Sequence, residues 1–252
     1  NLSSSCKGKT LLIQRAACYS PNSEEKDLAI LQEVGCLFDD VKIIGEDELV
    51  ESFSTYNQLI SAESVGAVNV YYHIISMARS PKALDCLEQL EQRGIRVLNP
   101  SVGIRACQRS NVDKVMRENH LPLPPDEGDD GYWVKRADAA AQSKEDVCFC
   151  HDWAEVEKIK STFMQRGITD VVTQAHVKGD VVKFYGVEGT NFFRYYYSGD
   201  DTETKFGDEE RNGKPRYYLF SSSNLQADAE KLACLLQTPI YGGDAIVRED
   251  GS

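Results

Sequence analysis

The stretch Asp170–Gly189 reads DVVTQAHVKGDVVKFYGVEG and is the most informative part of the chain. Two valine-rich runs, Val171–Val177 and Val181–Val187, flank the polar break Lys178-Gly179-Asp180. Runs of β-branched residues bounded by a glycine turn are typical of strands, so the pattern predicts two adjacent strands. Lys183 falls inside the second run. A charge within a strand usually lies on a solvated face, which is the alternative to a functional role for this lysine.

The chain before Asn99 alternates between strand and helix patterns. The predicted strands are Thr10–Gln14, Val41–Ile44, Ala67–Tyr72 and Ile95–Leu98, and the predicted helices are Glu24–Val34 and one that begins at Ser80-Pro81 and stops at Gly94. Strands separated by helices imply a parallel sheet with crossover connections. The first strand-to-helix connection has no GxGxxG motif, so a dinucleotide fingerprint is absent. We therefore expect residues 1–98 to form an N-terminal parallel α/β domain.

The chain after Asn99 is richer in strands. Two short helices are expected over 99–120, with a capping box at Ser110-x-x-Asp113, and the proline-rich segment 121–130 is expected to be a linker or turn. The remaining predicted elements are the strands 131–136, 146–150, 190–198, 216–220 and 240–248, the helix Trp153–Arg166 capped by Asp152, and the helix Gln226–Gln237. This mixture predicts an α+β organisation.

The composition restricts the classes of protein to which the chain can belong. Its 252 residues, 41% hydrophobic and 27% charged, are those of an ordinary globular protein of one large or several small domains. No apolar run approaches the roughly 20 residues that span a bilayer, and the start lacks the apolar core of a secretory signal. The net charge of −12 disfavours nucleic acid and anionic membranes as partners. The eight cysteines form no CxxC pair, which fits a reducing cytoplasm.

Several motifs occur in a fixed order along the second part of the chain. Asn99-Pro100, Asp113-Lys114 and Leu121-Pro122-Leu123-Pro124 come first, and Lys135, the opening stretch and Asp244 follow. Together they resemble the ATP-grasp superfamily, whose members activate a carboxylate with ATP. The resemblance covers about Asn99 to Ser252. It implies an ATP-grasp fold in which the N-terminal domain is followed by two α+β lobes, 99–177 and 178–252, that enclose the nucleotide.

The resemblance assigns three lysines of the first lobe to ATP. Lys114 would reach the nucleotide from its helix, and Lys135 is similar to the strand lysine on the α- and β-phosphates. The loop that follows this strand is normally glycine-rich, but here it reads Asp138-Ala139-Ala140-Ala141-Gln142-Ser143-Lys144. An alanine backbone still offers amides, though with less freedom in φ than glycine. Lys144 would compensate with a side-chain contact. The alternatives are a solvated helical lysine at position 114 and an edge-strand charge at position 135.

The resemblance also assigns residues of the two valine runs and of the break between them. Gln174-Ala175-His176-Val177 resembles the hinge whose backbone pairs with adenine, so His176 would act through its backbone rather than as a base. Asp180 would face the ribose hydroxyls, although it lies one residue earlier than the family's usual acid. Lys183 would point from the second strand toward the phosphates.

The resemblance places a metal ligand near the end of the sequence. Asp244 follows Tyr241-Gly242-Gly243 at the start of an apolar strand and is similar to the family's ligand for Mg²⁺. The alternative is a cap or turn residue. The family's next strand supplies a second acid and an asparagine, and the sequence given ends at Ser252, before that strand. Either further residues supply it or the metal site is incomplete.

The acidic segment Gly199–Pro215 is long for a loop, which is typical of a mobile or functional segment. Grasp-fold enzymes often close such a loop over the acceptor, so we expect a lid in which Lys205, with Arg194 of the preceding strand, faces the transferred phosphoryl group. The alternative is a solvated loop.

The function that these assignments predict is an ATP- and Mg²⁺-dependent ligase. It would couple a small-molecule carboxylate to an amine or thiol through an acyl phosphate, and a homodimer is compatible with the resemblance. Three alternatives stay open at this point. They are a catalytically silent nucleotide-binding or regulatory protein on the same fold, a small-molecule kinase, and a bilobed binding protein.

Overall fold

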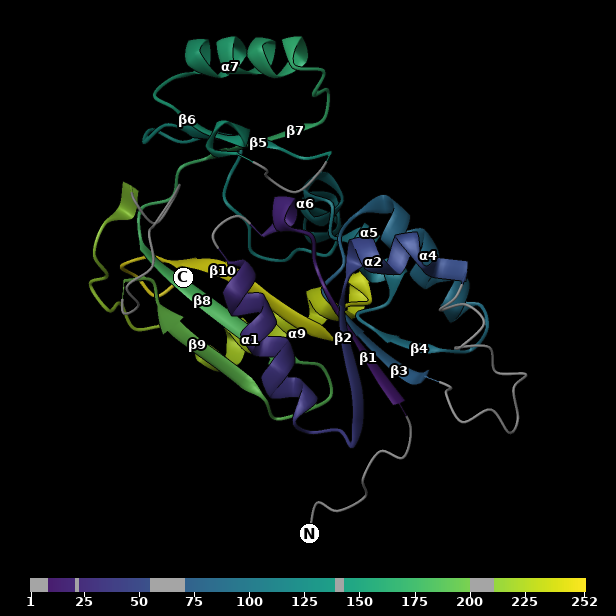
Figure 1. Cartoon of the computed structure of the whole chain (residues 1–252). Helices are drawn as coiled ribbons and strands as arrows, with labels where there is room; N and C mark the ends of the chain where they lie inside the picture. Colours follow the sequence, from purple (N-terminus) through teal and green to yellow (C-terminus); the bar gives the residue numbers. More distant parts are fainter. Residues whose placement is uncertain (1–8, 21–22, 55–70, 139–142, 200–210) are drawn as a thin grey trace. The chain divides into compact units, whose positions relative to one another are not determined.

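A computed structural model of the chain describes residues 9–20, 23–54, 71–138, 143–199 and 211–252 (Figure 1). The chain divides into two compact units, Asn1–Arg105 and Ala106–Ser252.

The first unit is built on a parallel sheet. Its strands are β1 (Lys9–Gln14), β2 (Asp40–Gly45), β3 (Tyr71–Ser76) and β4 (Arg96–Leu98), in the order β2-β1-β3-β4. The helices are η1 (Ala17–Tyr19), α1 (Glu24–Gly35), α2 (Glu46–Glu51), α4 (Pro81–Glu91) and α5 (Ser101–Ala106). The parallel α/β organisation expected from the alternating pattern is therefore confirmed. The strand expected at Ala67–Tyr72 falls mostly outside the described residues, and β3 continues past it to Ser76.

Helices of the first unit cover β1, an inner strand of its sheet. Helix α4 begins at the N-cap that the sequence predicts. Leu11, Leu12 and Ile13 of β1 have no exposed surface, as expected for a parallel strand covered on both faces. The side chain of Ser80 accepts the amide of Ala83 at 3.3 Å and so caps α4, which has Pro81 in its first turn. The local sequence thus sets the start of this helix.

The second unit begins with a helix and an antiparallel sheet. The elements are α6 (Arg109–Glu118), β5 (Tyr132–Arg136), η2 (Lys144–Asp146), β6 (Val147–Cys150), α7 (Trp153–Gln165) and β7 (Val171–Ala175), with the strand order β6-β5-β7. Figure 1 shows α7 along one side of this sheet. Val134 and Cys150 of the sheet pack there against Val156 and Phe163 of α7, all buried. Asp152 caps α7 by accepting the amide of Glu155 at 2.9 Å, as the sequence predicts.

A second antiparallel sheet completes this unit. It consists of β8 (Asp180–Val187), β9 (Phe193–Tyr197) and β10 (Ile240–Val247), in the order β10-β8-β9, and α9 (Ser222–Leu236) precedes β10. The Tyr241 hydroxyl on one face of β10 lies 3.5 Å from Glu230 of α9. A Cβ on Gly186, directly opposite Tyr241, would come within 2.2 Å of the Tyr241 ring. This face is therefore packed toward α9, and the alternate residues of the three strands lie on the other face.

Three expectations about local structure are wrong. The runs on either side of Gly179 become β7 and β8, which are not adjacent strands but belong to different sheets, because β7 pairs with β5 and β8 pairs with β9 and β10. The segment 216–220 is not a strand, since Tyr217 has a positive φ of 59°. The capping box at Ser110 is absent, because α6 already begins at Arg109 and the Ser110 hydroxyl donates to Asp170 instead.

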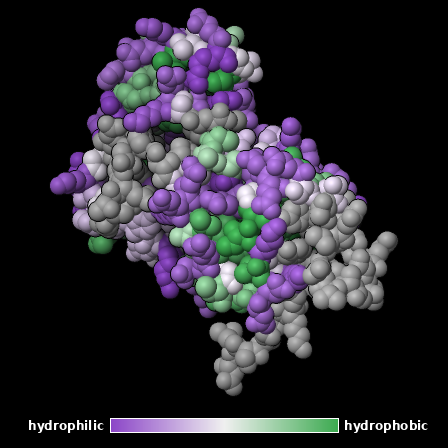
Figure 2. Space-filling view, in the orientation of Figure 1, coloured by the Kyte–Doolittle hydropathy of each residue, from purple (hydrophilic) through white to green (hydrophobic). Residues whose placement is uncertain are grey.

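Hydrophilic side chains cover most of the face seen in Figure 2, and hydrophobic ones appear there in small areas. Among the described residues, no helix is both long and apolar enough to cross a membrane.

Candidate functional site

The face of the β6-β5-β7 sheet that α7 does not cover carries polar and aromatic residues. Trp133 of β5 lies between Phe149 of β6 and Gln174 of β7 in the strand register, so their side chains share this face. Lys135, two residues further along β5, lies on the same face, with its Nζ 5.9 Å from the centre of the Trp133 ring. His176 follows β7 and joins the group.

An aromatic cluster fixes the imidazole of His176. The rings of Trp133 and Phe149 meet edge to face at 5.2 Å, and Trp133 Nε1 donates to His176 Nδ1 at 3.1 Å. Because Nδ1 accepts this hydrogen bond, the imidazole in its neutral form carries its own proton on Nε2. The amide of His176 donates to the Gly131 carbonyl at 2.8 Å, and the residue is only 7% exposed. The His176 ring is therefore an integral part of the packing of this face.

The connection between the two sheets is held by a residue that the sequence did not single out. Asn212 Nδ2 donates to the Val177 carbonyl at 3.2 Å, and Asn212 Oδ1 accepts the Gly179 amide at 3.1 Å. The neighbouring Arg211 places its guanidinium carbon 3.2 Å from the centre of the Phe149 ring. These two residues follow 200–210 in the chain, and an asparagine in a long acidic segment gives no sequence signal of such a contact.

Asp180 lies at the start of β8 and is 2% exposed. One carboxylate oxygen accepts the Arg216 amide and the other accepts the Tyr218 amide, each at 2.8 Å. These bonds satisfy the amides on either side of Tyr217, so these two amides are not available to pair with a strand. The contact between Asp180 and a ribose stays a prediction, which the observed hydrogen bonds of this carboxylate do not favour.

The face of the β10-β8-β9 sheet away from α9 brings charged residues together. Lys183 of β8 lies directly opposite Asp244 of β10 on one side and Tyr196 of β9 on the other. In the next row on the same face, Tyr185 lies opposite Gly242 and Arg194. The tertiary structure thus gathers three of the residues predicted from sequence, Lys183, Arg194 and Asp244, on one side of one sheet.

Helix α6 carries Lys114 and is tied to β7. Asp113 accepts a hydrogen bond from Gln174 Nε2 at 3.1 Å, so the first residue of the predicted hinge is linked to the helix that bears Lys114. The Lys114 ammonium is exposed and lies 3.9 Å from Glu118 one turn later. Ala175 is buried, and its amide donates to the Pro125 carbonyl at 2.8 Å.

Charged side chains organise the chain on both sides of residues 139–142, which lie outside the described residues. On the earlier side, Arg136 Nε donates to Asp138 at 2.6 Å. On the later side, Ser143 and Asp146 form a capping box around Lys144 and Glu145. Asp146 is 1% exposed and also pairs with Arg166 at 2.6 Å. Asp146 is a residue for which the sequence predicts no functional role.

Arg109 adds a further charge to this region. Its Nη1 donates to the Arg136 carbonyl, at the point where β5 ends. Burial lowers the pKa of Arg109, and the neighbouring Asp146 acts in the opposite direction. The base of the predicted phosphate loop is therefore rich in arginine, and its two ends are attached to the same buried carboxylate, since Arg136 also lies 3.9 Å from Asp146.

The described residues supply few ligands for a metal. They contain no group of three or more histidine, cysteine, aspartate or glutamate side chains that could hold a metal ion. Asp244 is exposed and offers one carboxylate on the same face as Lys183. Mg²⁺ is commonly bound by one or two carboxylates together with phosphate oxygens, so Asp244 fits a site that is completed by a nucleotide. Lys205 lies outside the described residues.

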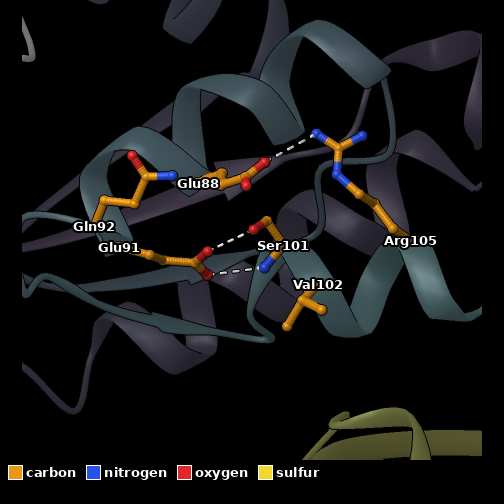
Figure 3. A pocket seen from close by; sticks show the side chains of 6 residues that line it. All are labelled: Glu88, Glu91, Gln92, Ser101, Val102 and Arg105. Carbon is orange, nitrogen blue, oxygen red and sulfur yellow. Dashed lines mark hydrogen bonds and ion pairs between the residues drawn. The ribbon is translucent and has the colours of Figure 1, made fainter.

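The first unit contains a pocket of about 370 Å³ between α4 and α5 (Figure 3). Both glutamates that line it have partners within the protein. Glu91 accepts hydrogen bonds from the amide and the hydroxyl of Ser101, and Glu88 lies 3.7 Å from Arg105. Glu91 therefore acts as the N-terminal cap of α5. None of the residues predicted for a site lines this pocket.

No known family model matches the sequence, and no curated protein matches it. Solved structures do match. VanG D-Ala:D-Ser ligase from Enterococcus faecalis has a TM-score of 0.63 at 12% identity, covering 97% of this chain and 88% of that one. A RimK domain ATP-grasp protein from Sphaerobacter thermophilus has a TM-score of 0.59 at 11% identity, with 96% and 87% covered. D-alanine–D-alanine ligase from Bacillus anthracis, complexed with ATP, has a TM-score of 0.58 at 13% identity, with 97% and 83% covered.

Proposed function

This chain has the ATP-grasp fold, and on that premise we propose that it is an ATP-dependent ligase that activates a carboxylate as an acyl phosphate. The observation that carries the proposal is the pairing of Lys183 with Asp244 across β8 and β10. This pairing brings a cation for phosphate and a carboxylate for a metal to one point of a sheet. We propose 1–98 as the N-terminal domain and 99–177 and 178–252 as the two lobes that hold the nucleotide.

The proposed nucleotide site uses both antiparallel sheets. The hinge, residues 174–177, offers backbone groups to adenine, and the buried cluster around Trp133 supports its position. Lys135 and Lys183 bind phosphate oxygens, each from the sheet face opposite to the one that packs against α7 or α9. Lys114 and Lys144 contribute charge from α6 and η2. Lysines suit this role because phosphoryl transfer requires mainly positioning and neutralisation of charge.

The proposed reaction has two steps. In the first, a carboxylate oxygen attacks the γ-phosphorus, the bond from that phosphorus to the β–γ bridging oxygen breaks, and ADP leaves. In the second, an amine or thiol attacks the acyl carbon, the bond from that carbon to the phosphate oxygen breaks, inorganic phosphate leaves, and the nucleophile releases its proton to solvent. Arg194, on the face that carries Lys183, would bind the negative charge of the transferred group. Lys205 is proposed for the same role from sequence alone.

Mg²⁺ is the metal proposed for this site, held by Asp244 and the phosphates. When bound, it would supply positive charge that neutralises the phosphate oxygens. The contribution of the chain is to keep the Asp244 carboxylate opposite Lys183 in the strand register.

A second candidate function is a nucleotide-binding protein without catalysis. Two observations favour it. Among the described residues no cluster of three potential metal ligands is present, and the predicted phosphate loop carries alanines where glycines are typical. Such a protein would bind the nucleotide through the same hinge and lysines.

Two measurements test the proposal. Calorimetry with Mg·ATP should show saturable binding, and ADP release should then depend on an added carboxylic acid and amine. Adding hydroxylamine should trap the acyl phosphate as a hydroxamate, which a small-molecule kinase would not produce. Nucleotide binding without acid-dependent ADP release would favour the silent protein, and absence of nucleotide binding would overturn both.

A further inference from the structure

The sheet face that carries Lys183 and Asp244 is aromatic and cationic in its next row. Tyr185 of β8 is 46% exposed, and Phe192, just before β9, is 47% exposed. Arg194 lies opposite Tyr185, with its guanidinium carbon 5.4 Å from the centre of the Phe192 ring. Large aromatic side chains exposed together beside a cation are uncommon on a surface that binds nothing.

Local packing holds the two tyrosines of this face in place. The rings of Tyr185 and Tyr196 are stacked with centres 6.2 Å apart, and their hydroxyl oxygens approach to 3.4 Å. A Cβ on Gly242 would come 2.8 Å from Cδ1 of Tyr185, so this glycine gives the ring the space to lie against β10.

Arg194 is also positioned by its own strand. Its Nη1 donates to the Phe193 carbonyl at 2.9 Å. A guanidinium has five N–H donors, so this bond leaves donors that can bind a carboxylate in the two-pronged geometry that arginine favours.

The row lies on the side of the Lys183–Asp244 pair away from the hinge. Strand residues advance by about 3.3 Å each, so Tyr185 lies about 7 Å beyond Lys183 along β8. Asp180 and the hinge are at the opposite end of the strand. A nucleotide whose base lies at the hinge and whose phosphates lie at Lys183 would point its terminal phosphate toward this row. The attacking carboxylate must lie next to that phosphate.

We propose that Tyr185, Phe192, Arg194, Tyr196 and Gly242 form the subsite for the carboxylate substrate, and that this substrate is a carboxylic acid with an aromatic ring. The guanidinium binds the carboxylate, and the exposed aromatic side chains pack against the substrate ring. This inference rests on the proposed function, because the orientation of the nucleotide places the substrate here.

The test is an NMR titration of the full chain with phenylacetate, acetate and 2-phenylethanol, each with and without a non-hydrolysable Mg·ATP analogue. Phenylacetate should bind, whereas acetate, which lacks the ring, and 2-phenylethanol, which lacks the carboxylate, should each bind at least about tenfold more weakly. Tyr185→Ala and Arg194→Gln should each raise the dissociation constant of phenylacetate about tenfold.

Tyr195→Ala is the matched control. Tyr195 is 44% exposed on the neighbouring strand, but its side chain lies on the opposite face of the sheet, against Phe220. This variant should bind phenylacetate like the parent. Tyr185→Ala and Tyr195→Ala should bind the nucleotide analogue like the parent, which shows that they fold, and an unchanged melting temperature should show the same for Arg194→Gln.

The outcomes separate the inference from the proposed function. Equal binding of acetate and phenylacetate, or equal losses in Tyr185→Ala and Tyr195→Ala, would overturn the subsite while leaving nucleotide binding intact. If the parent does not bind the nucleotide analogue, the proposed function fails, and the titration without nucleotide still decides whether this face takes aromatic acids.

Discussion

Lys183 of β8 and Asp244 of β10 are directly opposed in the antiparallel register, so their side chains leave the sheet on the same face. Opposed residues in such a pair have Cβ atoms about 4.5–5.5 Å apart. A cation and a carboxylate at that spacing attract each other and together carry no net charge. A nucleotide with its metal would give the lysine a phosphate and the aspartate a cation, so ligand binding would satisfy both groups separately.

Lys135→Ala and Lys183→Ala should each weaken Mg·ATP binding by about 1–3 kcal/mol, the range of a charge-assisted hydrogen bond. Calorimetry measures the effect. Lys158→Ala is a matched control, because Lys158 is exposed on α7, which covers the other face of the first sheet. Wild-type affinity in both test variants would show that the nucleotide lies elsewhere.

Asp244→Asn should lower ATP turnover far more than it lowers the melting temperature. The Asp244 side chain is exposed, so its charge contributes little to packing, whereas Mg²⁺ prefers a charged carboxylate oxygen. Parallel assays of ADP release and thermal unfolding measure the two effects. If the variant loses stability and keeps its turnover, Asp244 has only a structural role.

Asn212→Asp should destabilise the connection between the two sheets of the second unit. Aspartate can still accept the Gly179 amide, but it cannot donate to the Val177 carbonyl and places a negative oxygen beside it. We expect a loss of about 1–3 kcal/mol in the free energy of unfolding in urea, and weaker nucleotide binding.

Asn224→Asp makes the same chemical change at an exposed position in the first turn of α9. A negative charge is favourable there, so this control should be neutral or slightly stabilising. Equal effects of the two substitutions would remove the role given to Asn212.

Asp180→Asn should cost about 1–3 kcal/mol of stability, because an amide oxygen replaces only one of the two acceptors that bind Arg216 and Tyr218. The variant should keep the parent's preference between ATP and 2′-deoxy-ATP in calorimetry. A preference that disappears in Asp180→Asn would instead support the contact with ribose.

The free energy of unfolding should fall at high pH because Tyr241 ionises there. Burial, together with the charge of Glu230 and a hydrogen bond to it, raises the pKa of Tyr241 from 10.0 to about 12. The folded chain then holds this proton more tightly than the unfolded chain, so the stabilisation is complete below pH 10 and is lost as pH rises toward 12. Urea unfolding at pH 9 and pH 11 should show a smaller loss for Tyr241→Phe than for the parent. Identical losses would contradict the assignment.

Much of the fold follows from local patterns in the sequence. The strand–helix alternation before Asn99 predicts the parallel sheet, and the caps at Ser80 and Asp152 mark the starts of α4 and α7. These signals are legible because a cap or a run of β-branched residues acts over a few residues of chain. The same locality explains the error at 216–220, where a run of aromatic residues predicts a strand but the buried carboxylate of Asp180, far away in sequence, binds the amides.

Local sequence motifs point to the individual residues of the candidate site. They do not show which of these residues lie next to one another in the folded chain. The order of Lys114, Lys135, Lys183 and Asp244 suggests a nucleotide site, because each residue belongs to a recognisable local motif. Strand register alone sets Asp244 opposite Lys183 and Tyr185 opposite Arg194, and the two valine runs around Gly179 enter different sheets. The hydrogen bonds of Asn212 to Val177 and Gly179 likewise join residues more than thirty positions apart. Such contacts depend on which strands pair and which faces remain uncovered, and those choices minimise the free energy of the whole unit rather than of any one segment.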